Sequence, residues 1–387
     1  MGNAGQVGII GASAAGLYTA LLYALSHPAA HVTVFEKNEK PGKKILATGN
    51  GHCNLLHDPF EPSAFNHPAF VAALLSKHDL QSMIAALNDL GIVTMRKGEL
   101  LYPLSYSAAS VVTALLQKAS RHGIELRNAE AVVDVDGNRI VTNAGSYAFD
   151  RIVFAFGGKS QANLGSDGSM FDVLRKRGYR VTALRPSLCP IYSSDVPKSL
   201  FGVRHLAKVM YQSHGKTVYE ESGEIQFKKD GLSGIAVMNA SHYFCKEGVF
   251  VLDLFEEYEE REFASLLSRL YRSEKEGFLV SILEKPLMEY VQKSLNISAK
   301  AALNENDFAK IAHFLKHMRF RGEALYDFDA SQVTRGGIAL DDVKQNLQSK
   351  IHPAHFFAGE CLDIDGLCGG YNLGFALLSA LTVVDAL

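Results

Sequence analysis

A glycine-rich segment near the N-terminus has the residue types and spacing of a dinucleotide-binding turn. Gly11-Ala12-Ser13-Ala14-Ala15-Gly16 is a variant of the G-x-G-x-x-G fingerprint, with Ser13 in place of the middle glycine. Gly11 allows a tight turn, Gly16 lets a helix pack closely on a strand, and the helix N-terminus offers amide donors to a diphosphate. Because the middle glycine is missing, a plain strand-to-helix turn stays open as the alternative.

A carboxylate stands where such a site needs one. Glu36 ends the next apolar run, about twenty residues beyond Gly16, where an acid accepts hydrogen bonds from a ribose 2′-hydroxyl. An acid there repels a 2′-phosphate, so the pair predicts a nucleotide of the FAD or NAD type rather than NADP. A surface glutamate at a strand end is the alternative.

A second glycine-rich segment lies near the C-terminus. Gly359-Glu360 follows the apolar residues HFF, and Gly369-Gly370-Tyr371-Asn372 leads into an apolar stretch. A carboxylate at a strand end can bind polyol hydroxyls, and free amides at a helix start can face the flavin edge where negative charge develops on reduction. The alternative is an ordinary helix start in the core.

The segment Pro41–Asn54 is basic and rich in glycine. It predicts a loop that runs over a ligand, although a solvated loop has the same composition. The polar residues and glycines that could line a cofactor are Lys43, Lys44, Thr48, Gly49, Asn50, His52 and Asn54.

The elements that position these residues follow from the apolar spacing. A strand over 6–10, a helix over 14–25 and a strand over 31–35 predict one βαβ unit around the first glycine turn. Helical spacing recurs across 68–91 and 108–122, which we interpret as two helices. Strand-like segments follow up to Phe156 and run into Gly157-Gly158.

The character of the sequence changes near residue 186. Segments such as HLAKVMYQS and GVFVLDLF predict an antiparallel β block, and amphipathic helices are expected across 259–319. The βα pattern returns after Val333. The predicted fold class is therefore α/β. A Rossmann-type, glutathione-reductase-like domain is formed by residues 1–185 and 332–387, and a β-plus-helical substrate or cap domain, 186–331, is inserted.

Composition narrows the function classes. The 387 residues are 47% hydrophobic and 21% charged, and 39 basic against 41 acidic residues give a net charge of −2. These values are typical of a globular protein and predict neither a nucleic-acid nor a membrane partner. Five scattered cysteines without a C-x-x-C pair indicate a reducing compartment, and we expect a cytoplasmic protein without a metal site. The oligomeric state stays open.

The combination of motifs resembles a known family. The run GKKILATGNGHCNLL is similar to the G-K-K-x-L-x-x-G-G-G-R-C-N signature of the BaiN/YhiN-like flavoproteins. FAFGGKSQANLGSDGSMFDVLRKRGY, LRPSLCPI, DGLSGIAV and FFAGECLDIDGLCGGYNLGFAL look like later blocks of that family. The resemblance spans essentially the whole chain. It implies an FAD domain built from both chain ends, with an inserted domain that roofs the isoalloxazine.

The resemblance also implies which residues bind FAD. The ADP half is expected at Gly11, Ser13, Ala14, Ala15, Gly16, Glu36 and Lys37. The loop residues Lys43 to Asn54 named above, with Val132, Gly157 and Gly158, are expected along the cofactor. The ribityl chain and ring are expected at Gly359, Glu360, Gly370, Tyr371, Asn372 and Leu373. His52 and Asn50 stand where the family usually has Arg and Gly, so we expect a different substrate preference from members that carry the Arg.

The predicted activity is that of an FAD-dependent oxidoreductase with hydride transfer at flavin N5. The first hypothesis is an NAD(P)H-linked reductase of a small, activated, enone-like substrate. Because the sequence has a single glycine fingerprint, NAD(P)H is expected to act as a transient electron donor without a domain of its own. An amine oxidase of the aminoacetone oxidase type and a non-catalytic FAD-binding redox sensor are the alternatives. No catalytic side chain is assigned.

Overall fold

The computed structural model describes residues 5–297 and 302–387, and its contacts divide the chain into two compact units. Unit 1 combines Met1–Pro186 with Ser331–Leu387, and unit 2 is Ser187–Ala330. Each unit has a hydrophobic core of its own.

A parallel five-stranded sheet forms the centre of unit 1, in the order β20-β10-β1-β2-β6. The central strand β1 pairs with β2 on one side and with β10 on the other, so that Ile9 lies between Val34 and Val153. Strand β20 extends the sheet beside β10 and thereby brings the C-terminal piece of the chain into the N-terminal sheet. The strands are β1 (Gln6–Ile10), β2 (His31–Glu36), β6 (Glu125–Asn128), β10 (Arg151–Phe154) and β20 (His355–Phe357).

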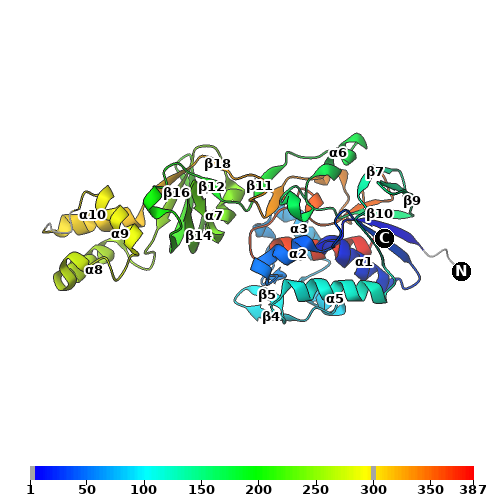
Figure 1. Cartoon of the computed structure of the whole chain (residues 1–387), viewed down its shortest axis with the longest axis horizontal. Coiled ribbons are helices and arrows are strands. Elements are labelled where there is room, and N and C mark those ends of the chain that lie inside the picture. The colour runs from blue at the N-terminus through cyan, green and yellow to red at the C-terminus, as the bar shows by residue number, and fades with distance from the viewer. Residues whose placement is uncertain (1–4, 298–301) are drawn as a thin grey trace. The chain divides into compact units, whose positions relative to one another are not determined.

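Helices of small and apolar residues cover this sheet. Helix α1 (Ala14–Ser26) is buried over most of its length and packs against the C-terminal helix α11 (Tyr371–Val384). Figure 1 shows α1 in blue beside the red C-terminal helix. The other helices of unit 1 are α2 (Lys43–Ala47), α3 (Pro68–Leu75), α4 (Leu80–Asp89), α5 (Ala108–Arg121) and α6 (Ser169–Lys176).

Two predictions for this unit need correction. The segment 38–54 is not only a loop, because Lys43–Ala47 forms the short helix α2 on the left-handed residue Gly42. The spacing across 68–91 belongs to two helices rather than one. Helix α3 ends at Leu75. Asp79 then caps the start of α4 by accepting a hydrogen bond from the Ser82 amide.

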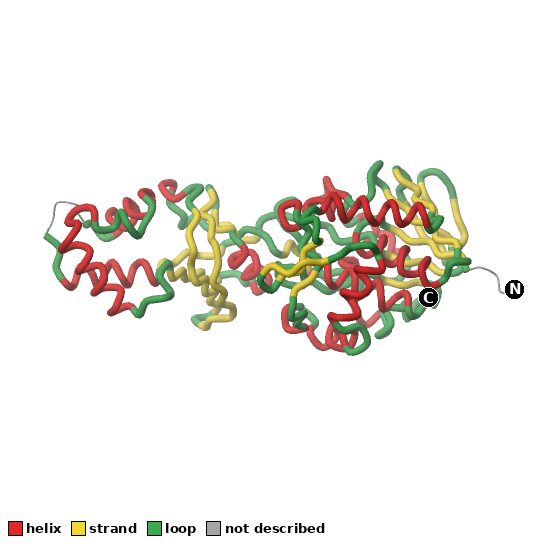
Figure 2. Tube along the Cα trace, turned by 90° about the horizontal axis from the view of Figure 1, so that it is seen from below, coloured by secondary structure: helices red, strands yellow, loops and turns green. Residues whose placement is uncertain are grey.

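Two small antiparallel sheets complete unit 1, and both are seen as yellow strands in Figure 2. One contains β7 (Val132–Asp136), β8 (Arg139–Thr142) and β9 (Ser146–Ala148). The other contains β3 (Leu56–His57), β4 (Thr94–Lys97) and β5 (Leu100–Pro103). Strands β11 (Arg185–Ser187) and β19 (Val333–Arg335) form a two-stranded sheet.

Unit 2 contains a seven-stranded sheet, with the helices of residues 260–316 gathered on one side of it and the short helix of residues 235–240 packed against the sheet itself (Figure 1). Its pairings are antiparallel, and its longest strand is β14, which takes up 13 residues of the β block. The strands are β12 (Ile191–Tyr192), β13 (Arg204–Ser213), β14 (Lys216–Lys228), β15 (Gly231–Ser233), β16 (Gly248–Asp253), β17 (Met318–Gly322) and β18 (Ala324–Leu325). The helices are α7 (Ile235–Ala240), α8 (Glu260–Glu274), α9 (Lys285–Ser294) and α10 (Glu305–Lys316).

Candidate functional site

The first glycine turn joins β1 to α1 with no room for side chains at its two glycines. Gly11 has φ 106°, and a Cβ added to it would lie 2.5 Å from the carbonyl oxygen of Ala155. A Cβ added to Gly16 would lie 1.9 Å from the carbonyl oxygen of Gly11. Ser13 precedes the helix in extended conformation, and its side chain does not cap it. The first amides of α1 therefore have the geometry of an anion site.

Glu36 is fixed beside this turn. Its side chain is buried at the end of β2, and one carboxylate oxygen accepts a hydrogen bond from the Ala12 amide at 3.1 Å. The other oxygen accepts from the amide and the side chain of Asn38 at 2.8 and 2.7 Å. A carboxylate held next to the glycine turn is the arrangement that binds a ribose hydroxyl in dinucleotide sites.

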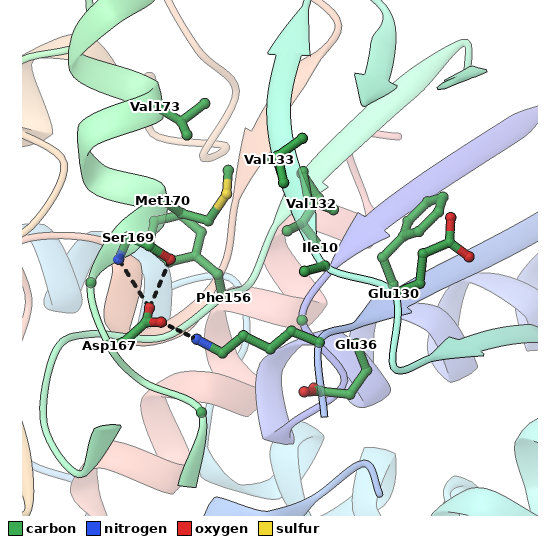
Figure 3. A pocket seen from close by; sticks show the side chains of 16 residues that line it. Ile10, Glu36, Glu130, Val132, Val133, Phe156, Asp167, Ser169, Met170 and Val173 are labelled. Carbon is green, nitrogen blue, oxygen red and sulfur yellow. Dashed lines mark hydrogen bonds and ion pairs between the residues drawn. The ribbon is translucent and has the colours of Figure 1, made fainter. Parts of the chain in front are cut away.

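A pocket of about 370 Å³ opens at this edge of the sheet (Figure 3). That volume is within the range of roughly 300–1,000 Å³ usual for small-ligand pockets. Apolar side chains of β7 and α6 face its space, and Glu36 lies at its base. An apolar slot beside a buried carboxylate is of the kind that takes an adenosine. The lining residues are Ile10, Gly11, Phe35, Glu36, Lys37, Glu130, Ala131, Val132, Val133, Phe156, Gly165, Asp167, Gly168, Ser169, Met170 and Val173.

Lys37 does not project freely into this pocket. Its ammonium group pairs with Asp167 at 2.8 Å, and Asp167 also accepts hydrogen bonds from the amide and hydroxyl of Ser169. Partial burial acts to raise the pKa of Asp167, but these contacts outweigh it and lower the pKa. The ion pair closes one wall of the pocket. The turn before α6 was not predicted as part of the site, although its Asp-Gly-Ser sequence is a helix-start signal.

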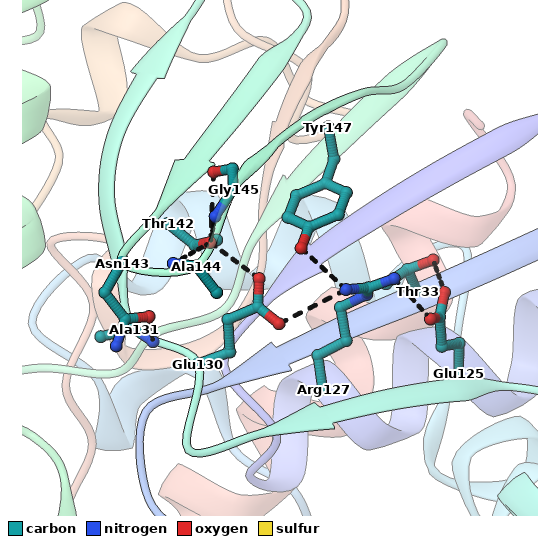
Figure 4. A network of polar contacts seen from close by, with 10 residues as sticks. All are labelled: Thr33, Glu125, Arg127, Glu130, Ala131, Thr142, Asn143, Ala144, Gly145 and Tyr147. Atoms are coloured by element: carbon teal, nitrogen blue, oxygen red, sulfur yellow. Dashed lines mark hydrogen bonds and ion pairs between the residues drawn. The ribbon is translucent and has the colours of Figure 1, made fainter.

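Glu130 is a second acid of the pocket that sequence reasoning missed (Figure 4). Its buried carboxylate accepts a hydrogen bond from Thr142 at 2.7 Å and pairs with Arg127 at 3.5 Å. The Arg127 guanidinium stacks over Tyr147 and donates to its hydroxyl at 2.8 Å. Burial acts to raise the pKa of Glu130, but its hydrogen bonds and Arg127 lower it overall. This network ties the end of β6 to β8 and β9, and Val132 of β7 pairs with Thr142 beside the pocket.

Residues from distant parts of the chain meet at a second point. Lys44 pairs with Glu360 at 2.7 Å, and each side chain is only 18% exposed. The second oxygen of Glu360 accepts from the Thr334 amide at 2.8 Å. A Cβ on Gly158 would lie 2.7 Å from a Glu360 oxygen, and one on Gly359 would lie 2.7 Å from the Ala15 methyl group. The structure thus brings the predicted residues Lys44, Gly158, Gly359 and Glu360 together near the start of α1.

The start of α11 offers backbone groups rather than side chains. Gly370 has φ 89°, and an added Cβ would lie 2.4 Å from the carbonyl carbon of Leu56. Asn372 closes the preceding turn through hydrogen bonds with Gly366 and Leu367. The Tyr371 ring is buried and stacks on His57 with centroids 4.5 Å apart. The groups of this segment that are open to a ligand are therefore the backbone amides in the first turn of α11, which includes Leu373.

The loop after α2 has a constrained backbone. Gly49 and Asn50 are both left-handed, with φ 55° and 52°, and asparagine tolerates that conformation where the family usually has glycine. The His52 ring stacks on the Tyr106 ring with centroids 4.0 Å apart, and the His52 Nδ1 lies 3.0 Å from the Tyr106 carbonyl oxygen. Thr48 donates its hydroxyl to the Ile45 carbonyl oxygen at 2.6 Å. Asn54 packs against Gly49, whose added Cβ would lie 3.2 Å from the Asn54 amide.

A parallel sheet with a glycine turn, a ribose-type acid and an adenosine-sized pocket defines a Rossmann-type dinucleotide-binding protein. The C-terminal strand β20 joins the same sheet, and Gly359 just after it lies against Ala15 of α1. The chain belongs to the family described as HI0933-like protein Rossmann domain, whose model matches residues 5–385. Its fold, its relatives and its site identify it as an FAD-dependent oxidoreductase, and the resemblance noted in the sequence is confirmed.

Curated relatives match the chain over nearly its whole length. It is 30% identical to a 3-dehydro-bile acid delta(4,6)-reductase of Clostridium scindens, over 96% of each chain. It is 26% identical to a ribosomal RNA dihydrouridine synthase of Haemophilus influenzae, also over 96% of each chain. A relative with that second name in Escherichia coli is 27% identical over 96% of this chain and 95% of its own.

A solved structure shows the same fold. A 3-ketosteroid delta1-dehydrogenase of Sterolibacterium denitrificans, in complex with 1,4-androstadiene-3,17-dione, superposes with a TM-score of 0.53 at 10% identity. The match covers 99% of each chain. Across residues 5–297 and 302–387, no helix combines the length and apolar character needed to cross a membrane.

Proposed function

We propose that this protein reduces a carbon–carbon double bond conjugated to a carbonyl group in a small ring compound, with electrons from NAD(P)H. The observation that carries the proposal is the agreement between two kinds of relative. A delta(4,6)-reductase of a 3-dehydro bile acid and a synthase of dihydrouridine both add hydrogen to a ring C=C bond beside a carbonyl. The substrates differ, but the bond and the polarity of the addition are the same.

FAD, when bound, supplies N5 as the atom that accepts and delivers a hydride. The chain's own residues bind and orient it in this proposal. The first amides of α1 bind the diphosphate, Glu36 binds the ribose, and the apolar slot at Val132 and Met170 takes the adenine. Gly370 and the first-turn amides of α11 stabilise negative charge at the ring edge.

The charge distribution favours a small molecule over an RNA substrate. Residues 187–330 contain 18 Lys and Arg against 21 Asp and Glu, and the whole chain is close to neutral. Proteins that bind nucleic acid neutralise phosphates with clustered Lys and Arg. Because two relatives are named for ribosomal RNA, the expectation of no nucleic-acid partner stays a prediction and is tested beside the small substrates.

The sequence has a single glycine fingerprint, and we assign it to FAD, so the proposed electron donor NAD(P)H has no nucleotide-binding turn of its own. Glu36 and Glu130 place two acids at the pocket, which suits the ADP half of FAD and disfavours a 2′-phosphate there. A nicotinamide nucleotide then has to dock transiently and leave before the substrate binds.

Anaerobic half-reactions test the proposal. The FAD-loaded protein is mixed with NADH or NADPH, and bleaching of the flavin absorbance is followed. The reduced protein is then mixed with a 3-oxo-4,6-diene bile acid, with a simple cyclic enone or with a uridine-containing RNA. We expect bleaching in the first step, and reoxidation by the small enones with a mass gain of two hydrogens.

Other outcomes identify the alternatives. Reoxidation by the RNA alone would replace the small substrate with a nucleic acid. No bleaching by either nucleotide, with peroxide release from small amines, would indicate an amine oxidase. A flavin that accepts no electrons from any of these compounds would indicate a redox sensor.

A further inference from the structure

Three side chains converge in the helical part of unit 2, which contains none of the predicted cofactor residues. Glu260 is the first residue of α8, while His313 lies in the last turn of α10 and His317 directly follows that helix. We expected no metal site from the sequence, and that expectation overlooked the H-x-x-x-H spacing of the two histidines. On a helix this spacing places both rings on one face.

The distances from Glu260 to each of the two histidines are close to those between ligands of one ion. His313 Nδ1 lies 3.3 Å from both carboxylate oxygens of Glu260, and His317 Nε2 lies 3.1 Å from one of them. One ligand atom from each residue can be chosen so that all lie within 4.8 Å of one another. Tetrahedral Zn²⁺ with bonds of about 2.0–2.1 Å has ligands about 3.3 Å apart. An ion can enter with small changes of side-chain rotamer.

The backbone beneath the cluster is anchored. Lys316 lies between the two histidines in sequence, is buried, and pairs with Asp253 at 2.8 Å. It also donates a hydrogen bond to the Phe255 carbonyl oxygen at 2.6 Å. Asp253 and Phe255 lie on the segment that leads into α8. This contact therefore fixes the end of α10 against the start of α8, so that the backbone positions of the three ligand residues are set before an ion binds.

We propose that Glu260, His313 and His317 bind one Zn²⁺ ion that fastens the start of α8 to the end of α10. Two imidazoles and one carboxylate are a ligand set that Zn²⁺ uses in proteins, with water in the fourth position. The exposed fractions of the side chains, 43% for Glu260, 65% for His313 and 41% for His317, leave the ion in contact with solvent. The site belongs to the helical part of unit 2 and is separate from the redox reaction.

Zinc titration of the full-length, FAD-loaded protein tests the site. The protein is stripped with EDTA, gel-filtered and titrated with Zn²⁺ by calorimetry. We expect one equivalent to bind, with at least tenfold weaker binding in His313→Ala, in His317→Ala and in Glu260→Gln. The double variant His313→Ala/His317→Ala is expected to lose this equivalent. His122→Ala removes an exposed histidine of unit 1 and is the matched control, which should bind zinc like the wild type.

Two further measurements keep the result interpretable. Co²⁺ should give visible d–d absorption typical of a four-coordinate ion in the wild type but not in the double variant. Zn²⁺ should raise the unfolding temperature of the wild type and the His122→Ala control, and leave that of the double variant unchanged. The flavin spectrum and the circular dichroism of each variant report whether it is folded. Absence of a bound equivalent in the wild type, or equal binding by the double variant, overturns the proposal.

Discussion

The close approach of Gly16 to Gly11 makes Gly16→Ala a sharp perturbation of the cofactor site. A methyl group would lie 1.9 Å from the Gly11 carbonyl oxygen, where an ordinary contact needs more than 3 Å. Helix α1 must therefore shift along or away from β1 by about 1 Å or more. Forcing an extra methyl group into a packed site costs roughly 1–3 kcal/mol.

That strain acts on the amides proposed to bind the diphosphate. If about 1.4–2.8 kcal/mol of this strain energy reduces the free energy of FAD binding, the FAD dissociation constant rises roughly 10- to 100-fold. The assay is titration of FAD into deflavinated protein, followed by the change in flavin fluorescence. Urea unfolding of the apo-protein measures the accompanying loss of stability.

Gly5→Ala is the matched control for this variant. Gly5 lies just before the same strand, and its added Cβ would meet only the Tyr23 hydroxyl at 3.5 Å, an ordinary contact. We expect wild-type FAD affinity for it. If Gly16→Ala binds FAD as tightly as the wild type, or Gly5→Ala loses as much affinity, the assigned role of the glycine turn is wrong.

Three other predictions concern the cofactor acid, a buried histidine and the thiols. Glu36→Gln should weaken FAD binding about tenfold, because a hydrogen bond to a charged group contributes roughly 1.5–3 kcal/mol; unchanged affinity in the same titration would contradict the ribose assignment. Burial lowers the pKa of His355 to about 4, so the unfolded state alone takes up this proton as the pH falls from about 6.5 towards 4. The free energy of unfolding should then drop by about 2 kcal/mol between pH 7 and pH 5 because of this group. Urea unfolding at both pH values should show a smaller drop in His355→Gln, and an equal drop would refute the cause. Burial also raises the pKa of the Cys53 and Cys189 thiols to about 11 and that of Cys361 further. Iodoacetamide at pH 8, with mass analysis, should therefore label the half-exposed Cys245 and Cys368 and spare those three.

The glycine turn and the βαβ unit could be predicted from the sequence because their signals are local. Gly16 is needed by its contact with Gly11 in the same turn, Gly11 adopts the positive φ of that turn, and the apolar runs around them mark the elements. We expected the C-terminal piece to return to the first domain because the βα pattern resumes after Val333, and in the structure β20 pairs with β10.

Other parts of the site depend on contacts that no local pattern reveals. Asp167 and Glu130 reach the pocket through a turn and a small sheet whose positions follow from tertiary packing. Tyr371 and Asn372 were expected beside the ribityl chain and ring, and their side chains serve the aromatic core and the turn itself. The partner of His313 and His317 comes from another helix, so only the spacing of the two histidines was readable in the sequence.

The most direct test of the central claim is the absorption spectrum of the natively purified protein, followed by titration with FAD. Joint binding by the two chain ends predicts a yellow protein with the bands of an oxidised flavin and one FAD per chain after saturation. A colourless protein that binds no added FAD would contradict it.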